Sequence, residues 1–306
     1  MPKKKRAGAG QKPIPKKKHS AAGKEIPMPK KKLKIGFFSL TCCEGCELAV
    51  LDLEERLLKA LNYIEIADSR LLLEKPLSKK LDIAFVEGSV ISKHDLDSLH
   101  SIRERSSFLV ALGACATIAG IPGIRNSLPD YLQDKIKRNQ IKPMKEKAFP
   151  ISAFVKVDFL LQGCSINEEE FLTFLNRFLH GKTTRLEQIP VCFECKHRQN
   201  SCLLLKGIAC LGPVTYAGCN ALCPSENAQC IGCRGFTDDA NFTALDSLFK
   251  EIGLSKEERH NLFTYFNQLP EELKEFAKEN SGELPNQLKE LAGENPKKKI
   301  DLEALK

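Results

Sequence analysis

The spacing of the cysteines constrains this chain more than any other feature of its sequence. The 306 residues include 13 cysteines, and eight of these lie between residues 192 and 233, in CFECKHRQNSCLLLKGIACLGPVTYAGCNALCPSENAQCIGC. An odd number of cysteines with tight C-x-x-C spacings is typical of metal or redox sites rather than of disulfides. Few apolar residues accompany these eight cysteines, so we expect this segment to fold around the group that its thiolates bind.

The sequence between residues 34 and 181 predicts a different kind of structure, in which short apolar strands alternate with helices. Apolar runs predict strands at 34–40, 63–68, 81–87, 107–113 and 157–163. Helical spacing predicts helices at 47–62, 93–104 and 165–181, the first with a stripe of Leu48, Leu51, Leu58 and Leu61. Ser165 and Glu168 match the S-x-x-E capping box that starts a helix. This order of elements predicts an α/β fold with a flavodoxin-like, doubly wound parallel sheet.

Four more cysteines follow the ends of predicted strands. Cys43 and Cys46 come after the first strand, Cys115 after the strand at 107–113, and Cys164 after the strand at 157–163. Doubly wound sheets bind their ligands at the carboxyl ends of the strands, so these thiols should converge on one point. Glycines beside them would let a bulky inorganic group approach the backbone. We therefore expect a ligand set at this edge of the sheet.

Twelve of the thirteen thiols suffice for three sites of four thiolates each, and Cys42 is then left over. Such sites hold zinc as well as iron–sulfur clusters, and the ligand type does not separate the two. Structural zinc usually takes two local pairs of cysteines, whereas the first site here draws on three strand ends. The proline after Cys223 is also typical of ferredoxin ligand runs. These features favour iron–sulfur clusters, with a zinc-stabilised binding protein as the alternative.

The positive charge of the chain is concentrated at its N-terminus. The net charge is +8, but residues 1–32 contain twelve Lys or Arg and one acid, so that they carry +11 and the remainder carries −3. This segment is rich in Pro, Gly and Ala and lacks periodicity, which predicts a disordered, Lys-rich arm. We expect the arm to contact nucleic acid, an anionic surface or an acidic partner, or to act only as a solubilising extension.

The composition also predicts where the protein resides and how it is divided. No apolar run reaches the roughly 18 residues of a membrane span, and no apolar signal segment follows the basic N-terminus. We therefore expect a cytoplasmic protein, in a compartment where thiols stay reduced. Four regions are predicted: the arm at 1–33, a flavodoxin-like domain at 34–185, a cysteine-rich, mostly irregular domain at 186–240, and a helical C-terminal extension at 241–306.

The predicted C-terminal extension has an amphipathic pattern. Its apolar residues predict one buried stripe, which we assign to packing, formed by Leu245, Leu248, Phe249 and Ile252.

Four separated motifs resemble those of the small subunit of nickel–iron hydrogenases. They are CEGC after a strand (43–46), VEGSV (86–90), GACATIAGIPG (113–123) and LQGC (161–164). The related 20 kDa subunit of NADH:quinone oxidoreductases shares the fold. The chain is most similar to the delta-type small subunits of soluble cytoplasmic hydrogenases, and the resemblance covers about residues 34–235.

The resemblance implies three 4Fe–4S clusters, each with four cysteine ligands. The proximal cluster maps onto Cys43, Cys46, Cys115 and Cys164. The distal cluster maps onto Cys192, Cys195, Cys202 and Cys210. The medial cluster maps onto Cys219, Cys223, Cys230 and Cys233. The family often has Gly-Cys-Pro where this chain has Gly163-Cys164-Ser165, and the quinone-linked relatives use tandem cysteines, so Cys42 could compete for the iron.

The resemblance also implies a function. This chain would relay electrons as part of an oxidoreductase, with no catalytic residue of its own, while a large partner subunit holds the nickel–iron centre. A further electron-transfer subunit, with a flavin or iron–sulfur group, would complete the hetero-oligomer. The alternative is an iron–sulfur subunit of a quinone- or ferredoxin-linked oxidoreductase without hydrogenase activity. Glu87, in the VEG motif, could transfer protons or simply accept local N–H bonds, and His197 could replace a distal thiolate.

Overall fold

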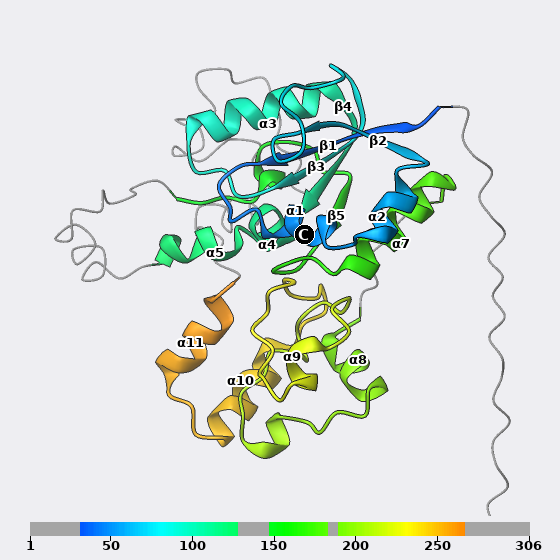
Figure 1. Cartoon of the computed structure of the whole chain (residues 1–306). Helices are drawn as coiled ribbons and strands as arrows, with labels where there is room; N and C mark the ends of the chain where they lie inside the picture. The colour runs from blue at the N-terminus through cyan, green and yellow to red at the C-terminus, as the bar shows by residue number, and fades with distance from the viewer. Residues whose placement is uncertain (1–30, 128–146, 183–188, 267–306) are drawn as a thin grey trace, which may run out of the picture.

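The computed structural model describes residues 31–127, 147–182 and 189–266 (Figure 1). Residues 1–30 of the Lys-rich arm and residues 267–306 of the predicted C-terminal extension lie outside these ranges. The described part forms two layers of structure, with a sheet and its helices above a cysteine-rich part in the view of Figure 1. Among the described helices, none is both long and apolar enough to cross a bilayer.

The sheet has five parallel strands in the order β2-β1-β3-β4-β5. The strands are β1 (Leu33–Ser39), β2 (Ile64–Ser69), β3 (Leu81–Glu87), β4 (Ser106–Leu112) and β5 (Phe159–Leu161). This is the flavodoxin-like order of a doubly wound sheet, with its switch point between β1 and β3. The predicted α/β fold class is confirmed, and all five predicted strands are present.

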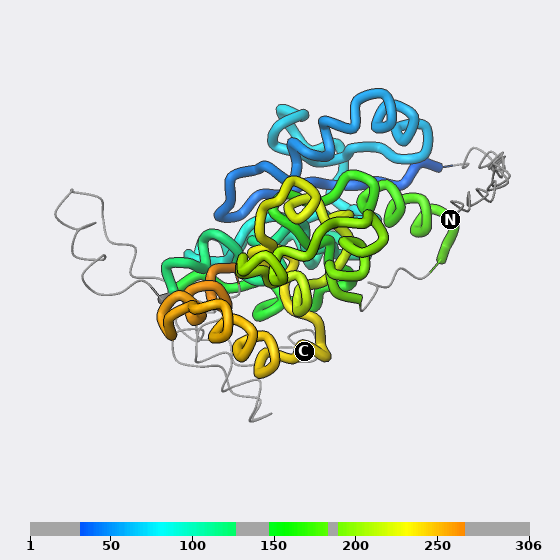
Figure 2. Tube along the Cα trace, turned by 90° about the horizontal axis from the view of Figure 1, so that it is seen from below, coloured from blue at the N-terminus to red at the C-terminus, as the bar shows by residue number. Residues whose placement is uncertain are grey.

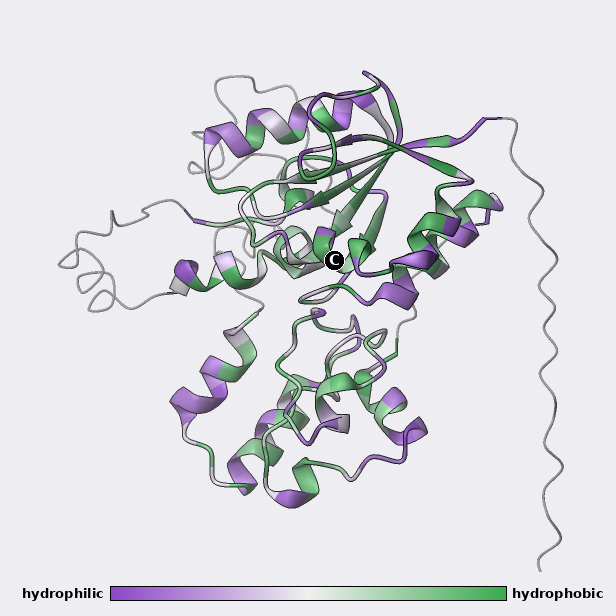
Figure 3. Cartoon of the chain, viewed as in Figure 1, coloured by the Kyte–Doolittle hydropathy of each residue, from purple (hydrophilic) through white to green (hydrophobic). Residues whose placement is uncertain are grey.

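Successive residues of the central strands point into two separate cores, one on each face of the sheet. On β3, Ala84 and Val86 belong to one core, and Ile83 and Phe85 belong to the other. The first core is covered by α3 (Lys93–Arg105). The second is covered by α1 (Gly45–Leu51), α2 (Glu55–Ala60) and α7 (Glu168–Leu179). Figure 3 shows the hydrophobic strands between helices of mixed character. Burial on both faces explains why these strands are continuous apolar runs.

The remaining elements of the upper layer are short. They follow β4 at the edge of the sheet and comprise α4 (Gly113–Ile118), α5 (Gly120–Gly123), η1 (Ile124–Ser127) and η2 (Ile151–Ala153).

Two predicted helices differ in the structure. The helix predicted at 47–62 is interrupted between α1 and α2, where Glu54 has a φ of 49°. The predicted stripe was also wrong in part, because Leu48 and Leu58 are exposed while Leu53 is buried. The predicted capping box was wrong as well: α7 begins at Glu168, and the side chain of Asn167 accepts a hydrogen bond from the Glu170 N–H at 3.0 Å.

The cysteine-rich part consists of short helices joined by irregular segments. Figure 2, seen from below, shows this part lying in front of the sheet. Its helices are α8 (Val191–His197), η3 (Leu204–Lys206) and α9 (Leu222–Ser225), followed by α10 (Phe242–Glu251) and α11 (Lys256–Thr264).

Helix α10 supplies much of the apolar surface that the cysteine-rich segment lacks. Leu245 and Phe249 pack into a third core with Val191, Leu211 and Val214. The predicted stripe is narrower than expected, since Leu248 is 42% exposed and Phe249 is fully buried. The cysteine-rich segment therefore does have a hydrophobic core, and a later helix completes it.

Candidate metal centres

The structure brings together the four cysteines predicted at the sheet edge. Cys43 and Cys46 lie at the start of α1, Cys115 lies in α4 directly after β4, and Cys164 follows β5. Burial, followed by the charges of Cys164, Cys43 and Glu87, raises the pKa of the Cys115 thiol to about 12. The pKa of Cys46 is also raised by burial, with smaller contributions from Glu87, Cys115 and Cys164. We call these four residues the proximal set.

Glycine is required where two of these segments meet. Gly113 has a φ of +79°, and a Cβ atom there would lie 2.3 Å from the Cys46 Sγ. The next N–H, from Ala114, donates to the Gly163 carbonyl at 2.7 Å, which ties the β4 and β5 ends together. The site therefore depends on close approach of backbone to sulfur at the sheet edge.

Glu87 and Cys42 lie beside the proximal set. Glu87 is 3% exposed at the end of β3, and its Oε2 accepts a hydrogen bond from the Cys46 N–H at 3.2 Å. It thus accepts a local N–H bond, one of the two expectations for this residue, and burial raises the pKa of its carboxyl. The pKa of Cys42 is raised to about 12, first by burial and then by Glu87 and Cys115. Cys42 is therefore a fifth thiol next to the four.

A second group of thiols surrounds a small cavity in the cysteine-rich part. The cavity has a volume of about 30 Å³, and among its lining residues are Cys192, Cys195, Cys202 and Cys210. Burial and then these neighbouring thiols raise the pKa of Cys192 to about 12. A Cβ atom on Gly212 would lie 3.4 Å from the Cys192 Sγ and 3.5 Å from the Cys210 Sγ. We call these four cysteines the distal set. His197, at the end of α8, is exposed.

The last four cysteines form the medial set, which adjoins both other sets. Burial raises the pKa of Cys233 to about 11, and the charges of Cys219, Cys164 and Cys223 add to this effect. Cys230 interacts electrostatically with Cys233 and with Cys210. The Cys164 N–H donates to the Cys233 sulfur, and the Cys230 N–H donates to the Cys210 sulfur at 3.4 Å. The three sets therefore follow one another in space as proximal, medial and distal.

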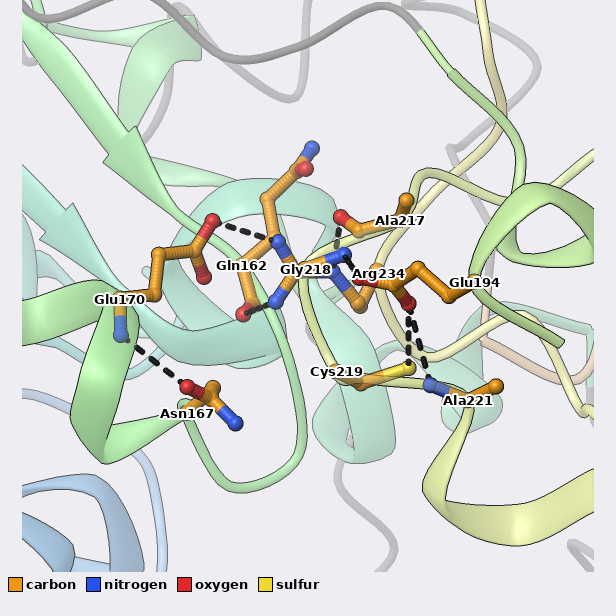
Figure 4. A network of polar contacts seen from close by, with 9 residues as sticks. All are labelled: Gln162, Asn167, Glu170, Glu194, Ala217, Gly218, Cys219, Ala221 and Arg234. Atoms are coloured by element: carbon orange, nitrogen blue, oxygen red, sulfur yellow. Dashed lines mark hydrogen bonds and ion pairs between the residues drawn. The ribbon is translucent and has the colours of Figure 1, made fainter. Parts of the chain in front are cut away.

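Three charged residues near the medial set were missed by the sequence reasoning. Glu194 of α8 accepts hydrogen bonds from the Gly218 N–H at 2.8 Å and the Ala221 N–H at 3.0 Å, and so holds the loop around Cys219. Arg234 and Glu170 form a buried ion pair at 2.8 Å (Figure 4). The position of Glu194 between two cysteines was the only sequence signal, and charged residues are too common for that signal to be specific.

The donor atoms fit iron–sulfur clusters. Each set offers four thiols, and glycine leaves space beside the sulfur atoms of the proximal and distal sets. Backbone N–H groups point at the sulfurs of Cys233 and Cys210, as is common around such clusters. Within the described ranges, no three His, Cys, Asp or Glu side chains are arranged to hold a single metal ion.

Comparisons with known proteins agree with this description. Residues 43–178 match the family model described as NADH ubiquinone oxidoreductase, 20 Kd subunit. The chain is 40% identical over 236 residues to the sulfhydrogenase 2 subunit delta of Pyrococcus furiosus, which covers 76% of this chain and 99% of the relative. It is 27% identical over 263 residues to the iron-sulfur subunit of the F420-non-reducing hydrogenase of Archaeoglobus profundus, which covers 66% of this chain and 82% of that relative.

A solved structure of a NAD+-reducing [NiFe]-hydrogenase in the H2-reduced state contains a similar chain, with 27% identity and a TM-score of 0.46. The match covers 51% of this chain and 96% of that chain. Because the identity to the Pyrococcus furiosus subunit extends over nearly the whole of that relative, the chain belongs to the family of nickel–iron hydrogenase small subunits and is a subunit of an oxidoreductase.

Proposed function

We propose that this chain is the electron-transfer small subunit of a cytoplasmic nickel–iron hydrogenase, with three 4Fe–4S clusters that relay electrons between the large partner subunit and an external acceptor. The observation that carries the proposal is the spatial order of the thiols. Cys164 of the proximal set contacts Cys233 of the medial set, and Cys230 of the medial set contacts Cys210 of the distal set. A continuous series of sites is what stepwise electron transfer requires.

In this proposal each set holds one cluster, with the ligands assigned above from the sequence. A bound 4Fe–4S cluster accepts and releases one electron at a time, at a potential set by hydrogen bonds, burial and nearby charge. The chain contributes the N–H bonds to the sulfurs of Cys233 and Cys210. Glu87 fixes the start of α1 through the Cys46 N–H, and Glu194 fixes the loop around Cys219.

The exposure of individual thiols supports partners at both ends of the series. Cys43 and Cys164 of the proximal set are exposed in the isolated chain, which leaves a face for the large subunit with the nickel–iron centre. Cys202 of the distal set is also exposed, on the side where a flavin or iron–sulfur subunit would take up electrons. We further propose the four regions predicted from the sequence, with the Lys-rich arm at 1–33 available to an acidic partner or surface.

A second candidate function is an iron–sulfur subunit of a quinone- or ferredoxin-linked oxidoreductase without hydrogenase activity. The match to the 20 kDa quinone-reductase family over residues 43–178 favours it, as does the proximity of Cys42 to Cys115 and Glu87. Metal analysis of the native complex separates the two functions, since only a hydrogenase contains nickel in its large subunit.

Substitution of Cys164 by serine tests the proposed relay. We expect the purified complex to lose hydrogen-dependent dye reduction, because the first site in the series lacks a ligand. Isotope exchange between hydrogen and water at the partner's metal centre should remain, since it needs no electron exit. Cys42→Ser is the matched control, and it should retain both activities. A Cys164→Ser complex that still reduces the dye at the wild-type rate would contradict the proposal.

A further inference from the structure

Arg234 is the largest fully buried side chain in the described part of the protein, with 1% of its surface exposed. Each of its three nitrogens donates a hydrogen bond (Figure 4). Nε donates to the Ala217 carbonyl at 2.8 Å, and Nη1 donates to the Gln162 carbonyl at 2.6 Å. Nη2 donates to Glu170 Oε1 at 2.8 Å. The guanidinium is therefore held between the sheet layer and the cysteine-rich part.

The partners of Arg234 belong to segments that carry proposed ligands. Gln162 lies two residues before Cys164, and Ala217 lies two residues before Cys219. Arg234 itself follows Cys233 directly. One side chain thus connects the loop of a proximal ligand to two segments of the medial set.

The structure makes room for this guanidinium at a specific position. Gly218 has a φ of +120°, and a Cβ atom there would lie 2.1 Å from Arg234 Nη2 and 2.8 Å from Glu170 Oε1. No other residue type could occupy position 218 without displacing the ion pair. The backbone is therefore shaped around the arginine.

The same place contains the direct contact between the proximal and medial sets. The Cys164 N–H donates to the Cys233 sulfur, and both residues adjoin atoms that Arg234 holds. The positive charge also acts on Cys219 of the medial set. Glu170 Oε1 balances this charge, while its Oε2 is buried without a hydrogen-bond partner among the described residues.

We propose that Arg234 and Glu170 are a positioning pair for electron transfer between the proximal and medial sites. Arg234 keeps Cys164 and Cys233 in contact, and the Glu170 carboxylate offsets the charge that Arg234 places beside the medial site. The inference rests on the proposed function, because it requires clusters at both sets. Reduction adds negative charge to a cluster, so an unbalanced arginine would favour the reduced form.

Glu170→Gln tests the charge, because it keeps a hydrogen-bond acceptor and removes the carboxylate. The experiment is a redox titration of the intact, anaerobically purified complex, followed by electron paramagnetic resonance. At the wild-type midpoint, we expect the ratio of reduced to oxidised medial cluster to rise about three- to tenfold, about 30–60 mV for one electron. Glu169→Gln is the matched control: Glu169 is the preceding residue of α7, is exposed and pairs with Arg56. It should leave the ratio unchanged.

Arg234→Lys tests the geometry, because it keeps the charge but lacks the planar fork. We expect a weaker magnetic interaction between the reduced proximal and medial clusters, with iron content unchanged. A medial potential that is unchanged in Glu170→Gln would overturn the inference, as would an unchanged magnetic interaction in Arg234→Lys. A wild-type complex without iron–sulfur signals would instead overturn the proposed function, so the two failures are distinguishable.

Discussion

Single thiols in this protein are strongly affected by their surroundings. Burial, together with nearby thiols, raises the pKa of Cys115 and of Cys192 to about 12. Without a bound metal, both groups therefore keep their protons at neutral pH. Iron binds the thiolate, so cluster binding has to displace these protons. The cost of burying four thiolates is offset only when the metal is present.

This displacement predicts how metal affinity depends on pH. Because the raised pKa values lie far above neutrality, each thiol releases its proton on metal binding throughout the range from pH 7 to 9. We expect the affinity of the cluster-free chain for a probe ion, cobalt(II), to rise about tenfold per pH unit for every proton displaced. A spectroscopic titration of the thiolate–cobalt bands at several pH values measures this slope. An affinity that stays constant between pH 7 and 9 would contradict the assignment.

The sequence predicted the thiols better than it predicted the charged residues around them. Thirteen cysteines with tight spacings have few chemical uses, and the structure groups twelve of them as the spacings suggest. Arg234 and Glu170 are 64 residues apart, and their pairing depends on how the two layers meet. No local pattern marks such a pair, because charged residues are usually solvated.

At the scale of elements, α10 has a role that its position at the end of the described chain does not suggest. Leu245 and Phe249 complete the core that also contains Cys210 and Cys230. The sequence predicted the helical stripe correctly as packing, but the packing partner was not predictable from periodicity alone. Periodicity also failed to predict the break at Glu54, because a single residue with positive φ leaves little trace in a sequence.

Phe249→Ala tests the contribution of α10. The side chain is fully buried, so its loss should lower the free energy of unfolding of the cysteine-rich part by about 3–5 kcal/mol. Leu248→Ala is the control on the same helix, because Leu248 is 42% exposed and should cost much less. Denaturant unfolding followed by the visible absorbance of the clusters measures both variants. Equal losses for the two variants would show that α10 does not belong to this core.

At the scale of the whole molecule, the two layers depend on metal to different extents. The two cores of the sheet are built from strands and helices, and only Cys46 of the proximal set packs against one of them. The third core contains Cys210 and Cys230, with Cys195 and Cys219 packed against it. The fold of the sheet followed from the alternation of strands and helices, whereas the arrangement of the cysteine-rich layer follows from contacts that alternation does not describe.

Removal of iron should therefore affect the layers unequally. After anaerobic treatment with a chelator, we expect backbone amides in residues 189–266 to lose protection from hydrogen exchange. Amides of β3 and β4 should stay protected, because their apolar cores persist. Hydrogen–deuterium exchange with mass spectrometry gives this comparison, and the iron-loaded protein is its reference. Uniform loss of protection in both layers would contradict the distinction.

The late position of α10 has a consequence for biosynthesis. The proximal set is complete at Cys164 and the medial set at Cys233, but α10 begins only at Phe242. Protein domains fold in order as the nascent chain leaves the ribosome. A nascent chain would present a finished sheet site while the core beneath its other two sites still lacked its closing helix, so maturation enzymes would deliver iron and sulfide from the sheet outward.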